Sequence, residues 1–254
     1  MAWDRHHSSW WSDTNMGIKN WIAVLLIVIM AAISGVLVAM LMQRPNLGAS
    51  VGEYTAKPVP MPTSSPRPVT LFIGDSYSAG AGASAEAKRW TTLSSKDLGW
   101  SEVNAALGGT GYLATAGKDG CGLDYCGTYL EAIAGVEKAE PDVIVISGGR
   151  NDNARLTQEV VEETIRSATA RWPEARVVVT SPLWDDDEPP VWLSDSVDRV
   201  RDAAAATGVT FLDLGQPLAD RGDYLSDDGV HPDDAGYAAI ANAFVGAWRA
   251  AFPA

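Results

Sequence analysis

The sequence is poor in positive charge and in histidine. Its 254 residues carry 19 lysines and arginines against 32 aspartates and glutamates, a formal net charge of -13. Such a chain repels a phosphate backbone, so we expect no nucleic-acid partner. Of its three histidines, His6 and His7 precede a long apolar segment, which leaves His231 for the rest of the chain. His231 is therefore the one histidine after the apolar segment that could transfer a proton.

Cysteine is scarce as well, since Cys121 and Cys126 are the only two. Cysteines this close in sequence can form a disulfide in an oxidising compartment, and two unlinked thiols in a loop are the alternative. A zinc site is not expected, because no second pair of ligands lies near them. The sequence predicts no metal and no other cofactor.

Charge is absent altogether from Trp21 to Met42. A helix of this length spans roughly 33 Å at 1.5 Å per residue, which matches the core of a bilayer. A cleaved signal peptide would have a shorter apolar region and would end at small residues, whereas this run ends in Met40-Leu41-Met42. We therefore expect one transmembrane helix at 21–42, preceded by a cytoplasmic segment at 1–20.

Residues 43–68 are expected to form a linker. They are rich in proline, serine, threonine and glycine, so neither a helix nor a central strand is expected there. An extended tether and a disordered linker are both compatible with this composition. Lysine and arginine are balanced on the two sides of the apolar run and do not orient it. The linker and the cysteine pair favour a location outside the cytoplasm for the domain that follows the linker, attached to the cell membrane by a single span.

Residues 69–254 alternate between short apolar runs and segments with helical periodicity. This alternation predicts one α/β domain, a five-stranded parallel sheet covered by helices. The expected strands are 69–73, 102–107, 142–147, 176–181 and 209–213. The expected helices are 85–98, 127–138, 156–171, 191–206 and 234–251.

Ligands bind at the carboxyl ends of the strands in such a sheet, and unusual residues follow three of them. The first strand is followed by Gly74-Asp75-Ser76, the second includes Asn104 and runs on to Gly108-Gly109, and the third leads into Gly149-Arg150-Asn151-Asp152. The last loop before a helix contains Asp228-Gly229-Val230-His231. A serine, a histidine and an aspartate are the groups that acyl transfer needs: a nucleophile, a base and a residue that orients the base.

These four blocks resemble those of the SGNH hydrolases, also called GDSL-type esterases. The resemblance covers roughly residues 69–251 and implies a three-layer α/β/α fold of the flavodoxin-like kind. Tyr77 stands where the first motif of that family has leucine, and Ala106 replaces a glycine of the second. The last two blocks are similar to the family patterns Gly-x-Asn-Asp and Asp-x-x-His-Pro. The Gly-x-Ser-x-Gly elbow of ordinary α/β-hydrolases does not surround Ser76.

The predicted catalytic residues are Ser76, Asp228 and His231. The oxyanion of the tetrahedral intermediate needs donors aimed at it, and we expect these from the backbone N–H groups of Ser76 and Gly109 and from the Asn151 amide. Gly109 is preferred to Gly108 because of its spacing from Asn104. Taken singly, each motif also fits a plain turn or a helix cap, so the prediction depends on the whole set.

Other polar and aromatic residues near these blocks are expected to be structural. Asp75 and Asp152 are interpreted as hydrogen-bond partners that fix loops. The acidic run 185–188 is predicted to be a solvated loop, with cation binding as the alternative. Trp184 and Tyr112 are candidate walls for an acyl chain or a sugar ring, although packing is the commoner role of such aromatic residues.

The sequence thus predicts a membrane-anchored serine esterase that hydrolyses carboxylic esters. Short-chain esters, lipid esters and acetylated cell-envelope glycans are all compatible substrates. Transfer of the acyl group to a sugar hydroxyl is an alternative, and a non-catalytic module that binds the cell envelope is a third hypothesis. The pattern does not indicate an oligomeric state.

Overall fold

A computed structural model describes residues 66–136 and 140–253. The chain divides into two compact units, Met1–Glu53 and Tyr54–Ala254, and all described residues belong to the second. The transmembrane helix predicted at 21–42 and nearly all of the predicted linker lie outside the described residues. In the ranges that are described, no helix is long and apolar enough to cross a bilayer.

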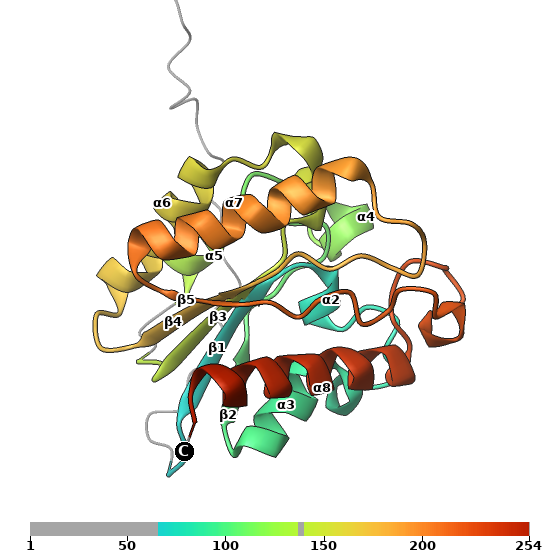
Figure 1. The fold of residues 1–254 in the computed structure, drawn as a ribbon, viewed down its shortest axis with the longest axis horizontal. Helices are drawn as coiled ribbons and strands as arrows, with labels where there is room; N and C mark the ends of the chain where they lie inside the picture. The colour runs from blue at the N-terminus through green and yellow to red at the C-terminus, as the bar shows by residue number, and fades with distance from the viewer. Residues whose placement is uncertain (1–65, 137–139, 254) are drawn as a thin grey trace, which may run out of the picture. The chain divides into compact units, whose positions relative to one another are not determined.

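The second unit is built on a single parallel sheet of five strands (Figure 1). The strand order is β2-β1-β3-β4-β5, which is the flavodoxin-like arrangement. The bounds are β1 Val69–Gly74, β2 Ser101–Asn104, β3 Val143–Ser147, β4 Arg176–Thr180 and β5 Thr210–Leu212. The predicted fold class and strand number are therefore confirmed for this unit.

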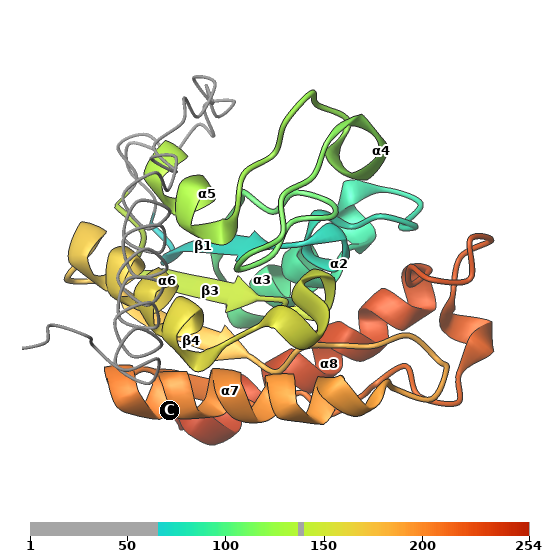
Figure 2. The same cartoon turned by 90° about the horizontal axis from the view of Figure 1, so that it is seen from above.

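Helices cover both faces of the sheet, so the unit has three layers (Figures 1 and 2). One face carries α5 Tyr129–Gly135, α6 Gln158–Arg171 and α7 Val191–Thr207, and the other carries α3 Trp90–Leu98 and α8 Asp234–Ala251. The short elements are α2 Ser76–Ala79, α4 Lys118–Cys121 and the 3₁₀ turns η1 Glu86–Lys88, η2 Arg150–Arg155 and η3 Gly222–Tyr224.

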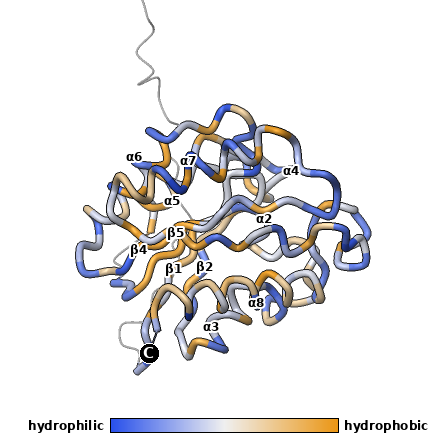
Figure 3. The backbone as a smooth tube through the Cα atoms, in the orientation of Figure 1, coloured by the Kyte–Doolittle hydropathy of each residue, from blue (hydrophilic) through white to orange (hydrophobic). Residues whose placement is uncertain are grey.

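Side chains of each strand alternate between two hydrophobic cores, one on each face. In β1, Leu71 and Ile73 pack under α5 and α6, whereas Phe72 packs against Trp90 and Phe244 on the opposite face. Figure 3 shows hydrophobic residues along the strands at the centre of the unit. Strands that are buried on both faces read as continuous apolar runs, which is why the sequence located them.

Three predicted elements differ from the structure in their extent. The strand expected at 102–107 ends at Asn104, because the Asn104 side chain accepts a hydrogen bond from the Ala106 N–H and turns the chain. The helix expected at 85–98 is interrupted at Arg89, whose backbone is extended, so η1 and α3 are separate. The helix expected at 127–138 ends at Gly135, and the last two residues of that prediction lie outside the described ranges.

Candidate active site

The register of the sheet brings three of the four predicted blocks together. β1 lies between β2 and β3, with Phe72 beside Asn104 and Gly74 beside Ser147. Because all three strands are parallel, the segments that follow them leave the same edge of the sheet. Ser76, the loop after Asn104 and the Gly149–Asp152 turn are neighbours for this reason.

Ser76 is the first residue of the short helix α2 and is partly exposed. Asp75 caps this helix, since its carboxylate accepts a hydrogen bond of 3.0 Å from the Tyr77 N–H. Within the part of the chain that the structure describes, the Ser76 N–H donates to no protein acceptor. A first-turn N–H has no partner inside its helix, so this group is available to a ligand.

The loop after β2 lies directly against Ser76. Leu107 N–H donates to the Gly74 carbonyl over 3.0 Å, and a Cβ placed on Gly108 would lie 3.7 Å from the Ser76 Cβ and 2.2 Å from the Gly120 carbonyl oxygen. Gly108 therefore has no room for a side chain. Gly109 has a left-handed backbone conformation, with φ of 74°, which glycine adopts more readily than residues with a side chain. The N–H groups of both glycines lack an acceptor among the described residues.

Asn151 lies in η2 and contacts the same loop. Its Nδ2 donates to the Thr110 carbonyl over 2.9 Å. An amide nitrogen carries two hydrogens, so this bond fixes the side chain and leaves one N–H for another acceptor. The three predicted oxyanion donors thus come from neighbouring segments of the carboxyl edge.

Asp152 is fully buried and holds the loop that follows Gly109. Its two carboxylate oxygens accept hydrogen bonds of 2.7 to 2.9 Å from the backbone N–H groups of Tyr112, Leu113 and Ala114. Burial raises the pKa of Asp152, and these three hydrogen bonds oppose that shift. The role expected for Asp152, fixing a loop, agrees with these contacts.

Asp228 and His231 form a hydrogen-bonded pair on the loop before α8. His231 Nδ1 lies 2.6 Å from Asp228 Oδ2, and Asp228 Oδ1 accepts from the N–H groups of His231 and Val230, each over 2.9 Å. Hydrogen bonds from the backbone and ring of His231 hold the pKa of Asp228 well below its ordinary value. The carboxylate is therefore ionised at neutral pH and fixes the Nδ1–H tautomer of the ring.

The His231 loop packs beside the helix that carries Ser76. The rings of His231 and Tyr77 are 5.9 Å apart, and a Cβ placed on Gly82, which lies just beyond α2, would be 3.1 Å from the His231 Cβ. No hydrogen bond between Ser76 and His231 is formed among the described residues. Such bonds are often long in enzymes without substrate and tighten in the complex.

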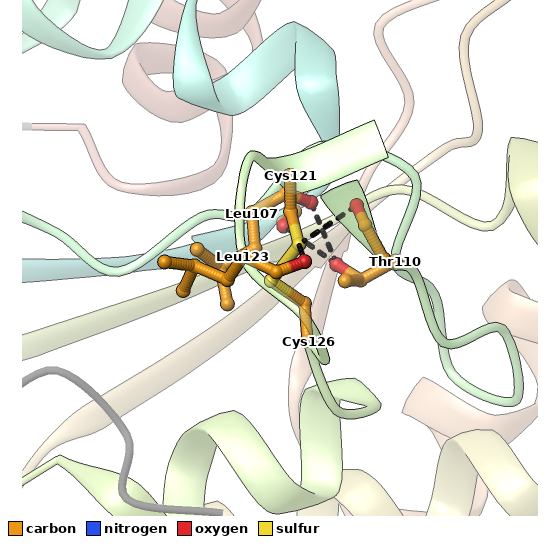
Figure 4. Close-up of a disulfide and its surroundings, with 7 residues drawn as sticks. Leu107, Thr110, Cys121, Leu123 and Cys126 are labelled. Atoms are coloured by element: carbon orange, nitrogen blue, oxygen red, sulfur yellow. Dashed lines mark hydrogen bonds between the residues drawn. A yellow bond between two sulfur atoms is a disulfide. The ribbon is translucent and has the colours of Figure 1, made fainter. Parts of the chain in front are cut away.

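The segment 116–126, which contains a disulfide (Figure 4), packs against residues 105–110 after β2, here called the glycine loop. Cys121 and Cys126 are bridged, so the first of the two alternatives for this pair is correct. Cys126 also pairs with Ala116 through two backbone hydrogen bonds, and Gly120 is the residue that crowds Gly108. The hydrogen bond of 2.8 Å from Thr110 Oγ1 to the Leu107 carbonyl, also drawn in Figure 4, closes the glycine loop.

The structure decides the role of Tyr112 and corrects the expectation for Asp185. Tyr112 is buried against Tyr129, with 4.9 Å between ring centroids, so it is a packing residue and not a wall of the site. Asp185 does not belong to a solvated acidic loop, because it is buried and pairs with Arg150 over 2.5 Å. Arg150 was not among the predicted site residues, although its place between Gly149 and Asn151 just after a strand is a signal in the sequence.

The fold and these residues define a three-layer α/β protein of flavodoxin-like strand order, with a serine at a strand end and an aspartate-histidine pair. The model of the GDSL-like lipase and acylhydrolase family matches residues 72–239, and the chain belongs to that family. It is 29% identical over 198 residues to GDSL lipase Rv0518 of Mycobacterium tuberculosis, a match that covers 69% of this chain and 83% of the relative. The chain is therefore an ester-hydrolysing enzyme.

Solved structures with the same fold include carbohydrate esterases and an acyltransferase. A family two carbohydrate esterase of Corynascus thermopiles matches with a TM-score of 0.57 and 20% identity over 76% of this chain and 68% of its own. A second, from Clostridium thermocellum in complex with cellohexaose, has a TM-score of 0.57 and 17% identity over 74% and 66%. Salicylyl-acyltransferase SsfX3 has a TM-score of 0.56 and 18% identity over 75% and 56%. At these identities the likeness establishes the fold alone.

The buried carboxyl of Asp75 generates a prediction about stability. Burial raises the pKa of Asp75 from 3.8 to about 6, so the folded protein binds this proton more tightly than the unfolded chain does. Through this group, the free energy of unfolding falls as pH rises from about 4 to 6, by an amount on the order of 3 kcal/mol. Asp75→Asn has no titrating carboxyl at this position, so its free energy of unfolding lacks this decrease. Urea unfolding of both proteins across that pH range measures the difference, and parallel pH curves would contradict the prediction.

Proposed function

We propose that this protein is a membrane-anchored serine esterase that hydrolyses carboxylic esters through an acyl-enzyme on Ser76. In this proposal His231 is the general base, Asp228 orients it, and the Ser76 N–H, the Gly109 N–H and the Asn151 amide form the oxyanion hole. The observation that carries the proposal is the 2.6 Å contact between His231 Nδ1 and an Asp228 carboxylate whose other oxygen holds two backbone N–H groups.

The proposed first step is attack of Ser76 Oγ on the ester carbonyl. Because Asp228 retains the proton on His231 Nδ1, Nε2 is free to take the proton of Ser76. The tetrahedral intermediate has its negative charge on the former carbonyl oxygen, where the three donors stabilise it. His231 Nε2 then returns the proton to the leaving alcohol, and the acyl group stays on Ser76. Water repeats the sequence and releases the carboxylic acid.

Exposed apolar side chains beside the site support an acyl substrate. Four of the five large hydrophobic residues that are exposed in the described ranges lie on two nearby segments. Leu113, Leu123 and Tyr125 belong to the segment 113–126, which contains the disulfide, and Val230 directly precedes His231. Each of the four has 38% to 41% of its surface exposed. Burial of each methylene of an acyl chain on such a surface contributes about 0.8 kcal/mol.

Transfer of the acyl group to a sugar hydroxyl is the second candidate. It needs the same acyl-enzyme and differs only in the nucleophile that resolves it. The shared fold with a salicylyl-acyltransferase supports it at the level of fold. We place hydrolysis first because the family comprises lipases and acylhydrolases. Acylated glycans and lipids of the cell envelope are the substrate classes that a tethered enzyme reaches.

The first prediction concerns the nucleophile. Ser76→Ala removes the atom that forms the acyl-enzyme, so we expect hydrolysis of p-nitrophenyl esters to fall by at least about 10³-fold. Ser194→Ala, an exposed serine on α7, is the matched control and keeps full activity. The acyl length with the highest kcat/KM separates an acetyl esterase from a lipase, and added acceptor sugar reveals any transferase product. Full activity of Ser76→Ala would overturn the proposal.

The second prediction concerns the Asn151 amide. If Asn151 donates to the oxyanion, Asn151→Ala lowers kcat by about 10²- to 10³-fold with little change in KM, because the bond is strongest in the transition state. Asn242→Ala, an exposed asparagine on α8, is the control. Steady-state kinetics on the same ester measures both. A rise in KM at constant kcat would show that Asn151 binds substrate and is not an oxyanion donor.

The third prediction concerns the anchor. We propose that residues 21–42 span the membrane and hold the catalytic domain outside the cytoplasm. The full-length chain then stays in the membrane fraction after alkaline carbonate washing, and a chain that starts at Val69 is soluble. Protease added to intact cells degrades the domain of the full-length protein. Protection of the domain in intact cells, with cleavage after lysis, would contradict the proposed orientation.

A further inference from the structure

Tyr77 occupies the position at which the family motif has leucine, and its hydroxyl is fully engaged. The hydroxyl lies 2.7 Å from the Val230 carbonyl oxygen and 2.8 Å from Arg150 Nη1. The side chain is 4% exposed, and burial raises the pKa of the Tyr77 phenol well above its ordinary value. It is therefore protonated throughout the range in which an esterase works.

The direction of both hydrogen bonds follows from chemistry. A guanidinium group only donates, so the phenol oxygen must accept from Arg150. The single phenol hydrogen is then committed to the Val230 carbonyl, which only accepts. A donor that itself accepts from a cation is polarised, which strengthens the bond to Val230.

Arg150 is held in place by two further contacts. Its Nη2 lies 2.5 Å from Asp185 Oδ2, and both side chains are largely buried, with 16% and 7% exposed. Its guanidinium group lies 4.0 Å from the centre of the Trp184 ring, a cation–π contact. The chain of contacts thus runs from the segment after β4, through η2, to α2 and the His231 loop.

The Val230–His231 peptide is the target of these contacts. Tyr77 binds its carbonyl oxygen, and Asp228 Oδ1 binds its N–H, which belongs to His231. A peptide group is planar, so a bond at each edge fixes its orientation and the position of the His231 Cα. Asp228 also holds the imidazole ring. The backbone that carries the His231 ring is consequently held from two sides, by Tyr77 of α2 and by Asp228 of the loop before α8.

We infer that Tyr77 is a positioning residue for His231 and that Arg150 and Asp185 hold Tyr77 in the orientation this requires. The inference rests on the proposed role of His231 as the base. The leucine of the family motif has no hydroxyl group and can only make apolar contacts. In this protein the Tyr77 hydroxyl instead forms a hydrogen bond to the Val230 carbonyl. A misplaced base slows the chemical step and leaves the binding of an ester unchanged.

The test compares two tyrosine-to-phenylalanine substitutions. Tyr77→Phe removes the bond to Val230, and Tyr237→Phe removes a similar buried bond, from the Tyr237 hydroxyl to the Ala81 carbonyl. We expect Tyr77→Phe to lower kcat about 10-fold with KM unchanged, and Tyr237→Phe to leave kcat within about 2-fold of wild type. Urea unfolding shows whether both variants are folded. Equal kcat values for the two folded variants would overturn the inference.

A second comparison tests the part played by Arg150 and Asp185. The double variant Arg150→Met/Asp185→Asn avoids leaving a buried charge unpaired. If the pair acts through the Tyr77 hydroxyl, the double variant lowers kcat in the wild-type background and has no further effect once Tyr77→Phe is present. Effects that multiply would show that the pair acts independently of Tyr77.

Ser76→Ala in the same assay separates this inference from the proposed function. An inactive Ser76→Ala together with equal kcat values for Tyr77→Phe and Tyr237→Phe overturns only the positioning role. An active Ser76→Ala overturns the proposed function and the positioning role with it.

Discussion

The site depends on the hydrogen-bonded register of β1 with its two neighbours. Gly74 lies beside Ser147 and Phe72 beside Asn104, so the residues that follow these strands leave the sheet at one edge. A shift of one residue would turn every side chain of β1 to the other face and move Ser76 away from the glycine loop. The two apolar cores resist such a shift, because each takes alternate residues of the strand. Packing of the interior thus fixes the geometry at the surface.

Carboxylates that accept backbone N–H groups shape the loops beyond that edge. Asp75 caps α2, Asp152 binds three consecutive amides, and Asp228 binds two amides and the imidazole ring. Hydrogen bonds to a charged acceptor are about twice as strong as neutral ones. They order segments that have no regular structure of their own, and the donors proposed for the oxyanion are held in place before substrate binds.

Local patterns in the sequence were sufficient to predict the sheet, and three of the four predicted motif blocks follow strands that lie side by side in it. The buried runs of β3 and β4 are apolar on both faces, and Gly108 and Gly109 follow the end of β2 within five residues. The contact between Arg150 and Asp185 was not predictable in this way, because it joins loops that follow different strands. The acidic run 185–188 looked uniform, although among the described residues Asp185 is its one member that forms an ion pair. The break at Arg89 and the turn after Asn104 also depend on hydrogen bonds that periodicity does not encode.

The central claim is that Ser76 carries the acyl group. Trapping the intermediate tests it most directly: the soluble domain is mixed with an activated ester, quenched with acid within milliseconds to seconds, digested and analysed by mass spectrometry. We expect one acyl adduct, on the peptide that contains Ser76, which disappears as water releases the acid. An adduct on another residue, or hydrolysis at full rate with Ser76 unmodified at every time point, would contradict it.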